Sequence, residues 1–125
     1  MKQFILHFII LASLFFSSTA FAKDAVVVPL YSPNVNAQTI GNLTSLITSE
    51  VDFSGRYDMV SQLDARPSSF NSKCVKSVSC LKSIATANKS EALIAGTTSK
   101  KGANLDFYLV MYENGKIIRF KSFTI

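Results

Sequence analysis

The stretch LDFYLVMYENGKIIRFKSFTI, residues 105–125, decides how the second half of the fold is built. Its centre, Asn114-Gly115, is a strong signal for a two-residue turn, because both residue types tolerate the positive φ angles of a type I′ turn. The flanking runs are rich in β-branched and aromatic residues, which favour strands. The stretch therefore predicts two antiparallel strands, 105–113 and 116–125, joined by a tight turn.

The turn also predicts a register for this hairpin. If Glu113 pairs with Lys116, then Leu109 lies opposite Phe120 on the face toward the core. The other face combines aromatic and basic side chains, which are typical of protein interfaces. We expect it to be free of helices and to bind a partner protein through Tyr108, Tyr112, Ile117, Arg119, Lys121 and Phe123. The alternative is an ordinary exposed sheet face with cross-strand pairs.

Upstream of the hairpin, predicted strands and helices alternate. Residues 92–97 and the short segment 57–61 are strand-like, and residues 77–88 have an apolar side at helical spacing. A longer amphipathic helix carries Ile40, Leu43, Ile47 and Val51 and ends near Gly55; Asn34 or Asn36 can cap its start.

The continuous apolar run 25–30 predicts a buried central strand. The resulting order is β-α-β-α-β-β-β. We therefore expect an α/β (α+β) domain with a mixed sheet, parallel at first and ending in an antiparallel meander, with two helices packed on one face.

The first 22 residues have the features of a cleaved export signal. Lys2 supplies a positive charge, an almost wholly apolar run covers residues 4–16, and residues 20–22 form an A-x-A site. Cleavage between Ala22 and Lys23 would leave residues 23–125 as one small domain in the periplasm or outside the cell. The apolar run is shorter than the roughly 20 residues that a membrane span needs. We expect neither a stable membrane anchor nor a lipid anchor, since no cysteine lies near the cleavage point.

The mature chain holds two cysteines, Cys74 and Cys80, and an exported protein favours a disulfide between them. Six residues of continuous helix would separate their Cα atoms by about 9 Å, more than the roughly 4.4–6.8 Å that a disulfide spans. Cys74 should therefore precede the helix and Cys80 should lie in its first turn, with Ser77 or Ser79 as the N-cap. A redox pair or a metal site is the alternative, but C-x5-C lacks the C-x-x-C spacing of thiol oxidoreductases.

The residues for catalysis are sparse. His7, the only histidine, leaves with the signal, and the serines then have only lysines as bases. We expect no enzyme activity, no cofactor and no metal site. Loss of Lys2 lowers the formal charge from +5 to +4, and the basic residues are scattered, so nucleic acid is not an expected partner.

Several motifs resemble one domain family. The strand 25–30 precedes a helix with Leu43, Leu46 and Ile47; GRYDMV at 55–60 and EALIAGT at 91–97 follow. This pattern resembles the α/β domain at the N-terminus of TolB and related CsgG-like and FlgO-like envelope domains. The resemblance implies a non-catalytic protein of the bacterial envelope that binds other envelope proteins. Such domains often end in a further helix, whereas this chain ends in a strand at Ile125, as a minimal version or a truncated reading frame would.

The sequence thus leaves two readings. The first is a periplasmic protein-interaction module. The second is a domain that binds a small ligand or a cell-wall glycan in a crevice at the carboxyl ends of the parallel strands, near Ser32 and Ser61.

Overall fold

The computed structural model describes residues 23–125, so the expected signal and Ala22 lie outside the described residues. The expected order of elements is confirmed, with one 3-10 turn added before the second helix. The elements are β1 (Asp24–Val27), α2 (Ala37–Phe53), β2 (Met59–Gln62), η1 (Cys74–Lys76), α3 (Val78–Ala87), β3 (Ala92–Lys101), β4 (Asn104–Glu113) and β5 (Lys116–Thr124).

The strands form one mixed sheet in the order β2-β1-β3-β4-β5. β1 runs parallel to both β2 and β3, whereas β3, β4 and β5 form an antiparallel meander. The parallel part and the antiparallel end are as expected. β2 and β5 are the two edges of this sheet within residues 23–125.

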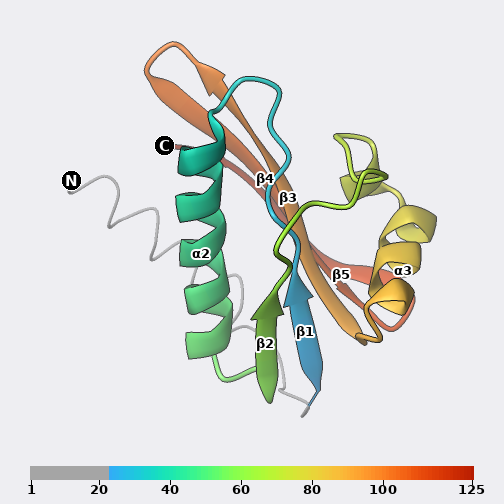
Figure 1. Cartoon of the computed structure of the whole chain (residues 1–125). Coiled ribbons are helices and arrows are strands. Elements are labelled where there is room, and N and C mark those ends of the chain that lie inside the picture. Colours follow the sequence, from blue (N-terminus) through green and yellow to red (C-terminus); the bar gives the residue numbers. More distant parts are fainter. Residues whose placement is uncertain (1–22) are drawn as a thin grey trace.

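The two helices lie on opposite faces of the sheet, so the expectation that both pack on one face is wrong (Figure 1). Helix α2 packs on Ala25 and Val27 of the first strand segment, and α3 packs on the face of Val26 and Val28. The chain moves from β1 outward to β2 and then back across β1 to β3. Because crossovers between parallel strands are right-handed, two crossovers in opposite directions place their helices on opposite faces.

Both helices begin at capped residues. The Asn36 side chain accepts a hydrogen bond from the Thr39 backbone N–H at 2.8 Å, which selects Asn36 over Asn34 as the cap of α2. The Ser77 hydroxyl accepts from the Cys80 N–H at 3.2 Å at the start of α3. These bonds satisfy backbone donors that have no partner inside the helix.

Candidate functional site

The β4–β5 hairpin has the turn that its sequence predicts. Asn114 and Gly115 have φ angles of 50° and 89°, as a type I′ turn requires. Glu113 pairs with Lys116, which confirms the first pair of the predicted register.

Beyond the second pair the predicted register is wrong. Ile118 is an extra residue in β5, so Met111 lies opposite Arg119, and Val110 opposite Phe120. Such a β-bulge moves each later side chain of the bulged strand to the other face. Phe120, expected in the core, is consequently 65% exposed.

The bulge divides the predicted partner surface between the two faces of the sheet. Tyr112 is buried in the core under α3, with an exposed fraction of 3%. Phe123 stacks on Phe107, with ring centroids 5.0 Å apart, on the face of α2. The α3 face carries Tyr108, Tyr112 and Ile117, whereas the α2 face carries Arg119, Lys121 and Phe123.

A different aromatic–basic cluster is present on the α3 face. The rings of Tyr108 and Phe120 stack with centroids 6.0 Å apart. The ammonium of Lys76, from η1, lies 5.1 Å from the centroid of the Tyr108 ring, within cation–π distance. We call Lys76, Tyr108 and Phe120 the aromatic cluster. The sequence pattern missed Phe120 because no local signal marks the bulge, and it missed Lys76 because η1 is distant from β5 in the sequence.

The backbone of β5 alternates between bonding to β4 and pointing outward. Leu105 and Ile125 exchange both N–H···O bonds, at 2.8 and 2.9 Å. Hydrogen-bonded and non-hydrogen-bonded pairs alternate in an antiparallel ladder. The N–H and C=O groups of Phe120, Ser122 and Thr124 therefore point away from β4, to the side on which residues 23–125 contribute no further strand.

The charged side chains of β5 are all basic: Lys116, Arg119 and Lys121. An open hollow of about 320 Å³ lies against the bulge and is lined by Ile117, Ile118, Arg119 and Phe120. We call the outward backbone groups of β5, together with Arg119, Lys121 and Phe120, the β5 edge.

A buried ionic cluster, which sequence reasoning missed, lies at the end of β4. Glu113 is 6% exposed, and its Oε2 accepts hydrogen bonds from Arg56 Nε at 2.9 Å and Tyr57 Oη at 2.7 Å. Its Oε1 lies 3.5 Å from Nζ of Lys23. The cluster joins three segments that are distant in the sequence, and so no local pattern could predict it.

Opposing effects act on the pKa values of this cluster. Burial acts to raise the pKa of Glu113, but hydrogen bonds from Arg56 and Tyr57 and the positive charges of Arg56 and Lys23 outweigh it and lower the pKa. Burial and the carboxylate of Glu113 raise the pKa of the Tyr57 phenol well above its usual value. Glu113 is thus held as a carboxylate and Tyr57 as a neutral donor, the states that their hydrogen bond needs.

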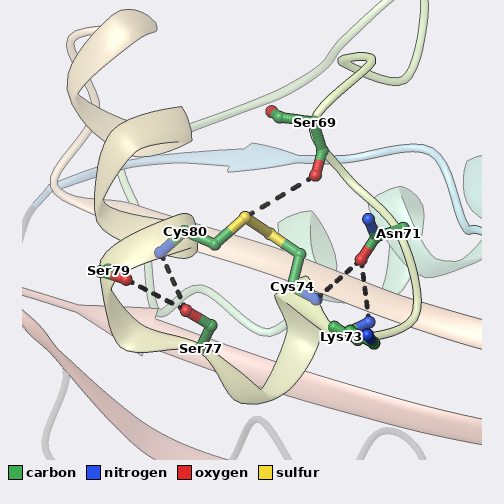
Figure 2. The surroundings of a disulfide bond; sticks show 7 residues. All are labelled: Ser69, Asn71, Lys73, Cys74, Ser77, Ser79 and Cys80. Atoms are coloured by element: carbon green, nitrogen blue, oxygen red, sulfur yellow. Dashed lines mark hydrogen bonds between the residues drawn. A yellow bond between two sulfur atoms is a disulfide. The ribbon is translucent and has the colours of Figure 1, made fainter.

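The predicted disulfide between Cys74 and Cys80 is present, with its Cα atoms 5.4 Å apart (Figure 2). Cys74 lies in η1 and Cys80 in the first turn of α3, as the spacing predicts. The Asn71 side chain accepts hydrogen bonds from the backbone N–H groups of Lys73 and Cys74. This corner places Lys76, between the two cysteines, over the Tyr108 ring.

The expected crevice residues Ser32 and Ser61 lie at different levels of the sheet. Ser61 pairs with Val26 inside β1, whereas Ser32 follows Tyr31, which bridges to Thr97 further along β3. The Ser32 hydroxyl instead accepts hydrogen bonds from the backbone N–H groups of Asn34 and Val35 in its own loop.

A second hollow, of about 360 Å³, lies between the α2 start and the β3–β4 turn. The side chain of Asn34 bonds the backbone of Lys100 here through both its oxygen and its nitrogen. The oxygen of Asn36 caps α2. The hollow is lined by Asn34, Val35, Asn36, Thr39, Lys100, Ala103, Asn104 and Leu105.

Within residues 23–125, no group of three or more histidine, cysteine, aspartate or glutamate side chains is placed to hold a metal ion. No helix in the same range combines the length and apolar character needed to cross a membrane.

The fold, with its mixed sheet between two helices, occurs in several solved proteins. The LpoB C-terminal domain from Salmonella enterica superposes with a TM-score of 0.58 at 12% identity, over 92% of each chain. Lipoprotein GNA1162 from Neisseria meningitidis gives 0.57 at 14% identity, over 82% of this chain and 79% of that one. The PelC dodecamer from Paraburkholderia phytofirmans gives 0.57 at 12% identity, over 87% and 77%.

No protein-family profile and no curated protein sequence matches the chain. The class of protein is therefore defined by structure: an α+β domain with the fold of the LpoB C-terminal domain and of lipoprotein GNA1162. At these identities the likeness shows a shared fold.

Proposed function

We propose that the mature chain is a non-catalytic protein-interaction domain of the bacterial cell envelope. The solved structures that share the fold include a lipoprotein and a protein that assembles as a dodecamer, and both descriptions fit envelope proteins that work through contacts. The resemblance to TolB N-terminal-like, CsgG-like and FlgO-like domains points in the same direction. The export signal, if cleaved before Lys23, would deliver the domain to the periplasm.

The observation that carries the proposal is the aromatic cluster next to the β5 edge. Phe120 is exposed and stacks on Tyr108, and Lys76 caps that ring. Aromatic side chains near arginine and exposed apolar area are features of protein contact sites. This cluster replaces the six-residue surface that the sequence predicted.

The placement of the perturbed titratable groups supports binding over catalysis. Glu113 and Tyr57 are buried and hydrogen-bonded to each other, and Arg56 bonds the same carboxylate. Catalytic groups with shifted pKa values typically line a cleft where a substrate can reach them. The arrangement of this cluster instead indicates a structural role, since it links three segments of the chain.

Photo-crosslinking in living cells tests the proposed function. The crosslinking amino acid benzoylphenylalanine replaces Phe120 in the aromatic cluster, and in a parallel strain it replaces Ser45 on the exposed face of α2. We expect a discrete crosslinked product with one envelope protein from position 120, identified by mass spectrometry. If neither position gives a protein product, the proposed function is rejected.

Binding of a small ligand or a cell-wall glycan is a second candidate function, because the volume of the 360 Å³ hollow falls in the usual range of ligand sites. Two of its polar side chains, Asn34 and Asn36, already make structural hydrogen bonds. A saturable rise in melting temperature with a muropeptide, lost in Asn104→Leu, would favour this candidate over a protein partner.

A further inference from the structure

The geometry points to a specific mode of binding: the β5 edge adds an extended acidic segment of a partner protein as a further strand of the sheet. This inference rests on the proposed function and deepens it, because it names the chemistry and the backbone geometry of the partner. The outward backbone groups, the charges of β5 and the exposed ring of Phe120 each support it.

The backbone of β5 presents the hydrogen-bonding groups that an added strand needs. Phe120, Ser122 and Thr124 direct N–H and C=O groups outward at every second residue. An extended peptide can bond such a row through its own backbone, which supplies affinity, while alternate side chains supply specificity. β2, the other edge, is only four residues long. Within residues 23–125, β5 is therefore the longer edge.

The side chains of β5 specify what the added strand must carry. On the α2 face Arg119 and Lys121 lie two residues apart, so a strand paired with β5 would place alternate residues beside them. Opposite charges favour aspartate or glutamate there. On the α3 face the neighbour is Phe120, which favours an apolar residue. The complementary segment thus alternates acidic and apolar residues.

A second copy of the chain is a poorer occupant of the same edge. Two β5 strands paired about a two-fold axis would bring Arg119 and Lys121 of one copy next to those of the other. Like charges opposite one another in a ladder destabilise the pairing. The basic side chains therefore disfavour self-association and favour an acidic partner.

Backbone hydrogen exchange with a defined probe tests the inference. The probe is a soluble nine-residue peptide that alternates glutamate with valine. We expect saturable binding and at least about tenfold slower exchange of the amides of Phe120, Ser122 and Thr124 when the site is filled. Arg119 and Lys121, whose amides already bond β4, should change much less.

Two variants and a matched control locate the binding. Ser122→Pro removes one outward N–H donor without removing a hydrogen bond to β4. We expect it to weaken binding of the peptide by about tenfold or more, because one hydrogen bond to the added strand is lost and the proline ring prevents its close approach. Ser122→Ala keeps that donor and should bind as the native chain does. The double charge reversal R119E/K121E should lower the affinity for the glutamate–valine peptide and raise the affinity for a lysine–valine peptide. Melting curves establish that each variant is folded.

Several outcomes would overturn the inference. Equal binding of the glutamate–valine and lysine–valine peptides would show that the basic side chains do not select the partner. Unchanged binding by Ser122→Pro would show that the outward backbone groups do not bond to the peptide. Binding to phosphatidylglycerol vesicles with no affinity for the peptide would assign the basic side chains to an anionic membrane surface. A dimer that forms through β5 in the absence of peptide would assign the edge to a second copy.

The crosslinking experiment separates this inference from the proposed function. A partner trapped from Ser45 but not from Phe120 would reject the β5 edge and keep the protein-interaction function. A partner trapped from Phe120 whose capture survives Ser122→Pro would keep the surface but reject strand addition.

Discussion

Two buried threonines have the same chemistry and opposite energetic roles. The Thr44 hydroxyl donates to the Ile40 carbonyl at 2.8 Å and accepts from the Leu30 N–H at 3.1 Å. The Thr98 hydroxyl is equally buried but has no hydrogen-bond partner within residues 23–125. A buried polar atom without a partner loses its bonds to water and gains nothing in return.

Replacement of each threonine by valine should therefore shift stability in opposite directions. Thr98→Val removes an unpaired hydroxyl and should raise the free energy of unfolding by about 1 kcal/mol, whereas Thr44→Val leaves the Leu30 N–H without its acceptor and should lower it by about 1–3 kcal/mol. Urea denaturation of the two variants beside the native chain provides the comparison. A loss of stability in Thr98→Val would mean that its hydroxyl has a partner after all.

At the scale of elements, the disulfide fixes the corner between η1 and α3. It joins Cys74 and Cys80, which are six positions apart in the sequence, and Cys74 is 2% exposed. The double variant Cys74→Ala/Cys80→Ala should lose about 2 kcal/mol of stability, the chain-entropy value for so short a loop. Chemical denaturation with and without dithiothreitol measures the loss. The reductant should destabilise the native chain and leave the double variant unchanged.

The same disulfide should influence the aromatic cluster, because Lys76 lies between the two cysteines. Without the bridge we expect η1 to be less ordered, and the cation–π contact of Lys76 with Tyr108 to weaken. The disulfide is thus a support for the candidate surface as well as for the domain.

Strand β5 should show an alternating pattern of amide exchange in the absence of any partner. The amides of Lys121 and Phe123 bond β4 and should exchange slowly, whereas those of Ser122 and Thr124 point outward and should exchange quickly. Two-dimensional NMR after transfer to D₂O resolves them residue by residue. Uniform protection along β5 would show that the outward groups are covered in the isolated domain.

At the scale of the whole molecule, the sheet separates two apolar cores that the helices close from either side (Figure 1). The Glu113 cluster ties three parts of this assembly: the segment before β1 through Lys23, the loop after α2 through Arg56 and Tyr57, and the end of β4. It should therefore govern how global stability depends on pH.

We expect the free energy of unfolding to fall as the pH drops below about 5, since an unfolded glutamate titrates near 4.3. The pKa of Glu113 is lowered in the folded state, so its contribution is fully present above the unfolded pKa and is lost as the pH falls through the folded value. Thermal unfolding between pH 7 and about pH 3 measures this dependence.

Glu113→Gln should be less stable at neutral pH, by roughly 3–5 kcal/mol, because it breaks the buried ion pair between Glu113 and Arg56. The variant should also lose much of the decrease in stability at acid pH. Asp106→Asn is the surface control: a hydrogen bond from Thr124 and the charge of Lys101 lower the pKa of Asp106. The Asp106→Asn variant should keep most of the decrease in stability at acid pH. An unchanged pH profile in Glu113→Gln would contradict the role of the cluster.

Features encoded within a few residues were predictable. The Asn114-Gly115 turn follows from the φ angles that the two residues tolerate, and the position of the cystine from the rise of a helix. The order of strands and helices follows from periodicity. The prediction that the six surface residues share one face was wrong, because one extra residue, Ile118, reverses the faces of the strand beyond it.

By itself, the sequence determined the elements, their order, the turn and the disulfide, because each depends on neighbouring residues and on local geometry. The tertiary structure alone decided that the helices cover opposite faces, since this follows from crossover directions. It also brought Glu113 to Arg56 and Tyr57, and turned Phe120 outward beside Tyr108. The prediction for the β4–β5 hairpin was thus correct for the turn and wrong for the register further from the turn. A turn depends on its own residues, whereas a bulge depends on how the whole strand packs on both cores.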